Sequence, residues 1–265
     1  MPISLSISTW NISQSEAKPH DDIWQKSAAS PLDFNSNQAI DSISDTIISW
    51  KSDIVILQEF PTKDAWCYLG LESLYVGGGF CAQSHCGFTT ILLSRKILIN
   101  FKVYALDIVG PTVIISICER QHPKNIPHKI TLIGGHLSPF KNGNRNRLCE
   151  ITEAIKVAEC HKGTSIIFGG DLNMRNEEMI NVKKIGLRDA FIELGSPKDA
   201  SVTWDSFRNK YHHEGFQFSC RFDRFLFSGN VNPVCIKTNA NTPVNGKEDH
   251  YLSDHFAVQT EWMFG

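Results

Sequence analysis

Six short segments, spread over almost the whole chain, hold residue types suited to the hydrolysis of a phosphate ester. They are Ser8-Thr9-Trp10-Asn11, Leu57-Gln58-Glu59, Gly135-His136-Leu137, Gly170-Asp171-Leu172-Asn173, Phe222-Asp223-Arg224 and Ser253-Asp254-His255. Hydrolysis of a phosphodiester requires charge neutralisation on the phosphoryl oxygens, a water made nucleophilic and a stabilised leaving oxygen. Carboxylates, amides and imidazoles provide these functions together only where the fold brings them to one place.

The residue types of these segments suggest separate roles. Glu59 is a hard oxygen ligand suited to Mg²⁺, which keeps most of its waters and needs few protein carboxylates. Asn11 can orient the shell of such a metal. His136 and His255 can donate to nonbridging phosphate oxygens, and a ring does this best as an imidazolium whose pKa a buried carboxylate has raised.

Asp171 and Asn173 are two residues apart, so an extended backbone would place both side chains on one face, with Asn173 able to bind the phosphate. Taken singly, each polar residue has a simpler interpretation, because Asp and Asn commonly form turns and a His is commonly a surface or core residue. The set and its order favour a functional site.

In this order the segments resemble the exonuclease, endonuclease and phosphatase superfamily, the metal-dependent phosphodiesterases that include deoxyribonuclease I and exonuclease III. Within it, three stretches are similar to the tyrosyl-DNA phosphodiesterases that act on 5′ ends. These stretches are Asp171-Leu172-Asn173-Met174-Arg175, Thr203-Trp204-Asp205 and Arg221-Phe222-Asp223-Arg224. The resemblance implies a Mg²⁺-dependent hydrolase, with Mn²⁺ as the second choice of ion, that cleaves a 5′-phosphotyrosyl bond between DNA and a trapped protein.

The resemblance also assigns roles to residues of this chain. It makes Asp171 the group that holds and deprotonates the attacking water, and Asp223 the partner of His255. It places Asp254 near the metal. The expected catalytic residues are Asp171, Asn173, His255, Asp223 and His136, and the expected metal residues are Glu59, Asn11 and Asp254.

Contact with DNA is expected from a local positive stripe and one aromatic ring. The stripe consists of Arg175, Arg208, Lys210, Arg221 and Arg224. Trp204 offers a face on which a base can stack, and core packing explains it equally well. Arg175, Trp204 and Arg224 are therefore the expected substrate-binding residues.

Two departures from the family pattern stand close to the expected site. Ser13 occupies the position, two residues after Asn11, where the family usually carries an acidic residue near the metal. Pro139 follows His136 by three residues, at a place where the phosphodiesterases that the chain resembles have a residue able to make a polar contact. We therefore expect one fewer negative charge around the ion.

Two other functions fit the same residues. A different substrate, such as an abasic or RNA end, a phosphoinositide or sphingomyelin, would use the same metal chemistry. A binding module that keeps the fold without catalysis is the alternative from another class. The intact set of Glu59, Asp171, Asn173 and His255 argues against it, because such residues act as a unit.

The composition narrows the classes of partner. The 265 residues carry 26 Lys and Arg against 28 Asp and Glu, a formal charge of -2, which excludes a polycationic nucleic-acid wrapper. Eight cysteines without a CxxC pair argue against zinc and favour a reducing compartment. The chain shows neither a signal peptide nor a membrane span, so we expect an intracellular monomer, cytoplasmic or nuclear, that does not bind membranes.

Alternating and continuous apolar runs predict the elements that must position these residues. Helices are expected from about residue 36 to Trp50 and from the 141–144 loop to about Gly163. Strands are expected at 3–7, 53–59, 89–94, 101–106, 111–118, 129–134, 165–168, 222–227, 234–237 and 256–261, those from 89 to 134 as an antiparallel meander. The pattern predicts one domain, 1–265, built as a four-layer α/β sandwich of two mainly antiparallel sheets flanked by helices.

Overall fold

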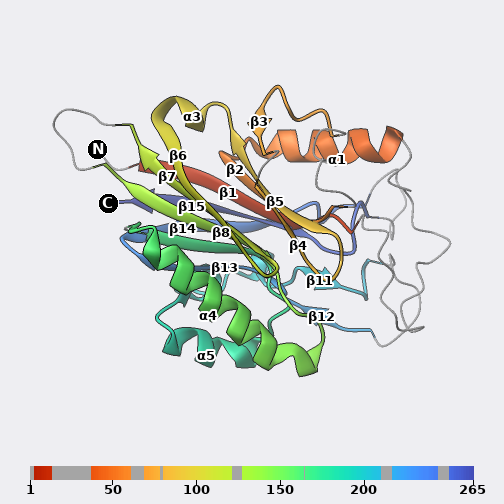
Figure 1. Ribbon diagram of the computed structural model, residues 1–265. Coiled ribbons are helices and arrows are strands. Elements are labelled where there is room, and N and C mark those ends of the chain that lie inside the picture. The colour runs from red at the N-terminus through yellow and green to blue at the C-terminus, as the bar shows by residue number, and fades with distance from the viewer. Residues whose placement is uncertain are drawn as a thin grey trace.

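The fold consists of two β-sheets packed face to face with helices on their outer faces (Figure 1). The computed structural model describes residues 3–13, 37–60, 69–77, 80–120, 127–163, 165–209, 217–243 and 251–265. The predicted strands Ile3 to Ile7 and Asp53 to Glu59 begin the first sheet, and most later predictions fall within observed strands. The predicted α/β sandwich is confirmed.

The first sheet contains seven strands in the order β14-β15-β1-β2-β5-β3, with β4 paired to β5. Its strands are β1 (Ile3–Asn11), β2 (Ile54–Phe60), β3 (Tyr75–Val76), β4 (Cys81–Gln83), β5 (Phe88–Ser94), β14 (Val231–Asn239) and β15 (Ala257–Phe264). All of its described pairs are antiparallel except β1 with β2, whose connection in the chain contains helix α1 (Asn37–Trp50).

The second sheet contains six strands in the order β10-β13-β9-β8-β7-β6. They are β6 (Phe101–Val109), β7 (Thr112–Glu119), β8 (Lys129–His136), β9 (Ser165–Asp171), β10 (Arg188–Asp189) and β13 (Asp223–Gly229). Its parallel pair is β8 with β9, which helix α4 (Asn144–Cys160) connects. A small ribbon pairs β11 (Trp204–Asp205) with β12 (Ser219–Cys220).

The shorter helical elements lie in the connections. They are α3 (Ile97–Asn100), α5 (Met179–Lys184), α6 (Ala190–Glu193) and the 3₁₀ turns η1 (Lys141–Gly143), η2 (Asn176–Glu178) and η3 (Lys198–Ala200). The loop expected at 141–144 is therefore the turn η1, which continues directly into α4. In the described part of the chain, no helix has both the length and the apolar character needed to cross a membrane.

Three apolar clusters produce the layers. The largest lies between the sheets and includes Ile56, Leu132 and Phe225. A second cluster joins α1 to the outer face of the first sheet, and a third joins α4 and α5 to the outer face of the second. Because both faces of the central strands are buried, their sequences are continuous apolar runs rather than alternating ones.

One prediction of strand pairing was wrong. The strand expected at 89–94 does not continue the meander, because β5 pairs with β2 in the first sheet. The chain then passes through α3 to the second sheet, where β6, β7 and β8 form the antiparallel meander. Short connections with turn residues do not show whether the chain stays in one sheet or crosses to the other.

Candidate active site

Strand register brings three of the expected residues next to one another. His136 at the end of β8 is directly opposite Asp171 at the end of β9. Asp223 at the start of β13 is opposite Asp171 on the other side. The three side chains therefore meet at one end of the second sheet, as residues opposite each other on adjacent strands must.

A glycine makes the close approach of β8 and β9 possible. Gly170 has a φ of 149°, a conformation that residues with a side chain rarely adopt. A Cβ at Gly170 would lie 2.0 Å from the carbonyl oxygen of Gly135. The Gly-Asp pair that ends β9 is thus required by the contact between the two strands.

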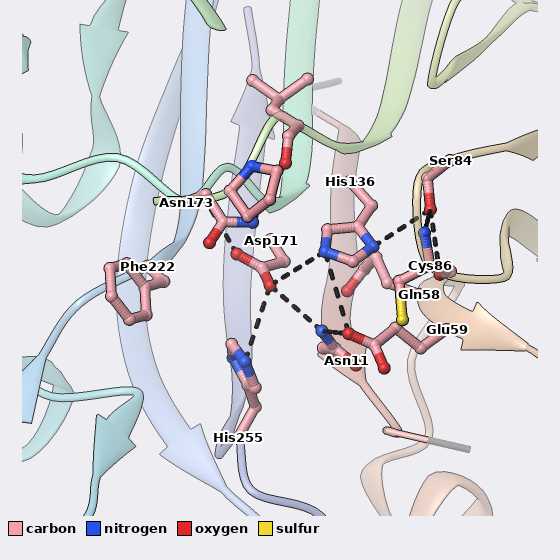
Figure 2. A network of polar contacts seen from close by, with 12 residues as sticks. Asn11, Gln58, Glu59, Ser84, Cys86, His136, Asp171, Asn173, Phe222 and His255 are labelled. Carbon is pink, nitrogen blue, oxygen red and sulfur yellow. Dashed lines mark hydrogen bonds and ion pairs between the residues drawn. The ribbon is translucent and has the colours of Figure 1, made fainter. Parts of the chain in front are cut away.

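Asp171 is the centre of the polar network shown in Figure 2. Its Oδ2 accepts a hydrogen bond from Nδ2 of Asn11 at 3.1 Å and lies 3.5 Å from Nε2 of His136 and 3.6 Å from Nε2 of His255. Burial alone would raise the pKa of the Asp171 carboxyl, but the two imidazoles and the hydrogen bonds outweigh it and hold the pKa below its ordinary value. Asp171 is therefore an ionised carboxylate.

His255 is held by a second buried carboxylate. Its Nδ1 lies 2.8 Å from Oδ2 of Asp223, and both residues are buried. Burial disfavours a charged ring, yet the charges of Asp223 and Asp171 raise the pKa of His255 well above its ordinary value. The raised pKa favours the cationic ring, with Nδ1 held by Asp223 and Nε2 facing Asp171, the form expected for binding phosphoryl oxygens.

Residues of neighbouring segments fix the position of this pair. The hydroxyl of Thr203 accepts hydrogen bonds from the backbone N–H groups of Phe222 and Asp223 at 3.0 and 3.1 Å. Trp10 donates from Nε1 to the carbonyl oxygen of His255 at 3.0 Å. Trp204 packs edge-on against the His255 ring, with centroids 5.0 Å apart.

Glu59 enters the site from a β-bulge. The pairing of β2 with β5 shifts register between Leu57 and Phe60, and Glu59 has a φ of 59°. Asn11 donates from Nδ2 to Oε1 of Glu59 at 2.9 Å, so this one amide group bridges Glu59 and Asp171. Burial, followed by the negative charge of Asp254, raises the pKa of Glu59 to about 7.

His136 differs from His255 in its charge. Its Nδ1 lies 3.2 Å from Oγ of Ser84, and its Nε2 lies 3.9 Å from Oε1 of Glu59. Burial lowers the pKa of His136, and the attraction of Asp171 does not compensate. We therefore describe His136 as a neutral imidazole, although two carboxylates lie within ion-pair distance.

The fit of a divalent cation follows from these charges. Glu59, Asp254 and Asp171 are acidic groups in one largely buried region, and burial together with the charge of Asp254 raises the pKa of Glu59, so a cation here would be stabilising. Oxygen donors of this kind suit Mg²⁺. Asn11 turns its NH₂ group toward the carboxylates, while its Oδ1 accepts from the backbone N–H of Ser13 at 2.9 Å.

A second group of possible ligands has a different character. Among the described residues, ligand atoms of Asp171, Asp223 and His255 lie within 4.8 Å of one another, which is compatible with a metal ion. A protonated His255 has no lone pair to offer, however. We therefore interpret this trio as a network of alternating charges.

Asn173 reaches the site through a turn rather than an extended strand. Its φ is 51°, its backbone N–H donates to Oδ1 of Asp171 at 3.0 Å, and its Nδ2 donates to the carbonyl oxygen of Leu137 at 3.0 Å. The backbone is therefore not extended beyond Asp171, where β9 ends, and the two side chains do not share one face of a strand. Asn173 is nevertheless adjacent to Asp171.

The expected positive stripe separates into exposed and buried members. Arg175 is half-buried, with its guanidinium 5.5 Å from the centre of the Phe222 ring, and Arg208 is exposed. Arg224 is fully buried, so its expected contact with substrate is wrong. Arg221 is buried too, and Lys210 lies outside the described residues.

Arg224 instead belongs to an ion network centred on Asp189. Asp189 accepts from Nη1 of Arg224 at 2.9 Å and from Nη2 of Arg221 at 2.8 Å. Arg224 also donates from Nη2 to the carbonyl oxygen of Met174 and to Oδ1 of Asn176 at 3.2 and 2.9 Å. The network thus supports the turn that follows Asp171.

Trp204 is also less accessible than expected. Its residue exposure is 9%, and its ring stacks on Phe218 with centroids 6.0 Å apart. Of the two interpretations left open, packing describes its contacts in this structure.

Two residues that support the site could not be predicted from the sequence. Ser84, in the turn between β4 and β5, holds His136, and Asp189 holds the buried arginines. Each stands alone in its stretch of sequence, outside any motif. Thr203, by contrast, belongs to a stretch that the sequence had already singled out.

Comparison with known proteins places this geometry in a family. Residues 8–255 match the Endonuclease/Exonuclease/phosphatase family. The chain belongs to that family. The match begins in the Ser8-Thr9-Trp10-Asn11 segment and ends at His255, so it spans all the site segments described above.

Relatives of known name within the family are 5′-tyrosyl-DNA phosphodiesterases. The protein of that name from Caenorhabditis elegans is 30% identical over 221 residues, which cover 80% of this chain and 58% of the relative. The Caenorhabditis briggsae protein is 26% identical over 216 residues, 78% of this chain and 59% of the relative. The chain therefore spans 58–59% of the length of these two relatives.

Solved structures share the fold of this family member. TDP2 from C. elegans superposes with a TM-score of 0.74 at 23% identity, covering 99% of this chain and 75% of that one. D. rerio TDP2, solved in complex with a single-strand DNA product, gives a TM-score of 0.73 at 20% identity and covers 98% of both chains.

Proposed function

We propose that this protein is a Mg²⁺-dependent phosphodiesterase that hydrolyses the 5′-phosphotyrosyl bond of a protein–DNA adduct. The observation that carries the proposal is Asp171, a buried ionised carboxylate between Nε2 of His136 and Nε2 of His255, linked to Glu59 through Asn11. The names of the two nematode relatives support the substrate, and the DNA product bound to the D. rerio protein supports the nucleic acid.

In the proposed reaction, Asp171 holds a water and takes its proton while the water oxygen forms a bond to phosphorus. His255 as a cation and His136 as a neutral N–H donor stabilise the nonbridging oxygens. The bond between phosphorus and the tyrosine oxygen breaks on the opposite side, which leaves a 5′-phosphate on the DNA.

The departing oxygen favours a tyrosyl substrate. A phenol has a pKa of about 10, so a phenolate leaves more readily than a sugar alkoxide and needs less help from a general acid. The released phenolate takes its proton from solvent. The five tyrosines of the chain lie outside the six segments that form the candidate site, which suits this leaving group.

Glu59, with Asn11 and Asp254, would hold the Mg²⁺, and Mn²⁺ is the alternative ion. When bound, the ion neutralises charge that develops on the phosphoryl oxygens. Arg175, at the edge of Phe222, remains our candidate for contact with the DNA backbone.

The test compares substrates at equal concentration. A single-stranded oligonucleotide with a 5′-phosphotyrosine, a matched abasic duplex, a phosphoinositide and sphingomyelin are each incubated with Mg²⁺ and with chelator. We expect Mg²⁺-dependent release of tyrosine to be the fastest reaction. Faster turnover of another ester would reassign the substrate, and turnover of none would favour a binding module.

Two further proposals concern the whole protein. We expect a single domain over residues 1–265 and an intracellular monomer, either cytoplasmic or nuclear. Limited proteolysis tests the first, and sedimentation equilibrium tests the oligomeric state. Imaging of a tagged chain tests the compartment.

A further inference from the structure

Phe140 presents an exposed aromatic ring at the edge of the candidate active site. It follows Leu137 by three residues, so the two Cα atoms are at most about 11 Å apart. Leu137 itself belongs to the site, because its N–H donates to the carbonyl oxygen of Asp171 and its carbonyl oxygen accepts from Asn173, both at 3.0 Å. The Phe140 residue is 44% exposed.

The backbone of Phe140 is in a conformation that few residues other than glycine adopt. Its φ is 65° and its ψ is 164°. Strained residues of this kind persist only where the surroundings determine them, and they cluster at ligand-binding and active sites. The ring of Phe140 is exposed, so packing in the core does not account for this backbone conformation.

A buried arginine imposes that conformation. Arg147 has no exposed surface, and its Nη1 donates to the carbonyl oxygens of Ser138 and Phe140 at 2.8 and 2.7 Å. Glu178 holds the same guanidinium through contacts of 2.8 and 3.0 Å. The loop that carries Phe140 is therefore anchored to η2, the turn beyond Arg175.

The charges around this ring favour an anionic strand. Two nearby acidic side chains are engaged inside the loop, since Glu150 accepts from the N–H and hydroxyl of Ser138 and Glu178 pairs with Arg147. Lys141 and Arg145, which follow Phe140 in the chain, are exposed. An exposed aromatic ring with exposed cations close to it in the chain is an arrangement that suits single-stranded nucleic acid, which is bound by stacking and by phosphate contacts.

We propose that Phe140 is a stacking platform for a base of single-stranded DNA close to the scissile phosphate. The proposal rests on the proposed function and specifies how its substrate is held. Arg147 acts as a positioning residue, because it fixes the backbone from which the ring projects. Lys141 and Arg145 contribute attraction for the strand without reading its sequence.

The experiment measures binding without turnover. A single-stranded oligonucleotide with a 5′-phosphate carries 2-aminopurine near that end, and its fluorescence is titrated with full-length protein in chelator. We expect quenching with the wild-type protein and a rise in Kd of about five- to a hundredfold for Phe140→Ala, the range that one stacked base provides. The Phe140→Trp variant should keep the quenching and the affinity of the wild-type protein, whereas the Phe140→Leu variant should lose both.

The controls separate stacking from damage to the loop. Alanine, leucine and tryptophan all keep a side chain at the same backbone position, so the strain at residue 140 is shared by the variants. Ile99→Ala removes a more exposed apolar side chain, 71% exposed, from α3 and should not change the Kd. Thermal unfolding confirms that each variant is folded.

Three results would overturn the proposal. They are an unchanged Kd for both Phe140→Ala and Phe140→Leu, no binding of the oligonucleotide by the wild-type protein, and an effect on binding of a phosphotyrosyl peptide but not of DNA. Measuring the release of tyrosine from a 5′-phosphotyrosyl oligonucleotide tests the proposed function separately from the role of Phe140. A protein that binds DNA through Phe140 but does not release tyrosine supports the platform and rejects the substrate.

Discussion

The carboxylate of Asp223 lies behind the ring of His255, with Oδ2 2.8 Å from Nδ1, and the contact turns Nε2 of the ring toward Asp171. Asp223→Asn removes the charge and keeps the shape. We expect the pKa of His255 to fall, because the charge of Asp223 is the largest influence that raises it. We also expect kcat to fall by about a hundredfold, since positioned acid–base groups typically contribute 10²–10⁴-fold.

Steady-state kinetics and NMR titration of the His255 ring check both parts of that prediction. Asp205→Asn serves as the matched control, because Asp205 is a partly exposed carboxylate close in sequence to Trp204. An unchanged ring pKa would show that Asp223 does not determine the charge of His255.

Asp171→Asn tests the water-activating role directly. The variant should lose at least about a hundredfold in kcat with little change in KM, because general-base catalysis acts in the transition state. The hydrogen bond from Asn11 to Oδ2 can be kept by the new amide oxygen, so the fold should survive. Near-normal turnover in the folded variant would remove Asp171 from this role.

Arg175 and Arg224 should separate binding from stability. Arg224→Ala leaves Asp189 with one of its two buried partners, and breaking a buried ion pair typically costs about 3–5 kcal/mol. Arg175→Ala removes a half-buried side chain on Phe222, so we expect little change in stability and weaker, less salt-dependent binding of oligonucleotides. Urea unfolding and binding at two salt concentrations measure the two effects, and equal loss of stability in both variants would contradict the assignment.

Asp189 should make the free energy of unfolding depend on pH in the acidic range. Burial raises the pKa of Asp189, but Arg221 and Arg224 outweigh it and hold the pKa below its ordinary value. An Asp whose pKa is lowered by folding contributes stability. This contribution is complete at pH values above the pKa of the same Asp in the unfolded chain, about 3.9, and it is lost as the pH falls through the pKa in the folded protein. The difference in unfolding free energy between wild type and Asp189→Asn should therefore shrink between pH 7 and pH 3. A difference that stays constant would show that the ion network does not titrate in this way.

The sequence predicted the layers and the residues at the strand ends because both follow from local patterns. Buried strands are continuous apolar runs, and the polar residues that end them meet once the register is set, as His136 and Asp171 do. The burial of Arg224 depends on Asp189, which lies 35 residues earlier on another strand and belongs to no motif. The neutral state of His136 and the left-handed turn at Asn173 likewise depend on packing and not on residue type.

Ser13 offers a test of the metal site that does not remove any group. It follows Asn11 by two residues, is buried, and has a φ of 51°, a conformation that Asp and Asn adopt more easily than most residues. Ser13→Asp should lower the Mg²⁺ concentration that gives half-maximal rate by about tenfold, because a carboxylate near a cation gains a few kcal/mol at an effective dielectric of about 20 before desolvation is subtracted. Ser13→Asn is the matched control, since it has the same shape and backbone preference without the charge. Mg²⁺ is titrated against initial rate at fixed ionic strength for all three proteins. A midpoint that stays fixed or rises in the Asp variant, or falls equally in the Asn variant, would place Ser13 outside the shell of the ion.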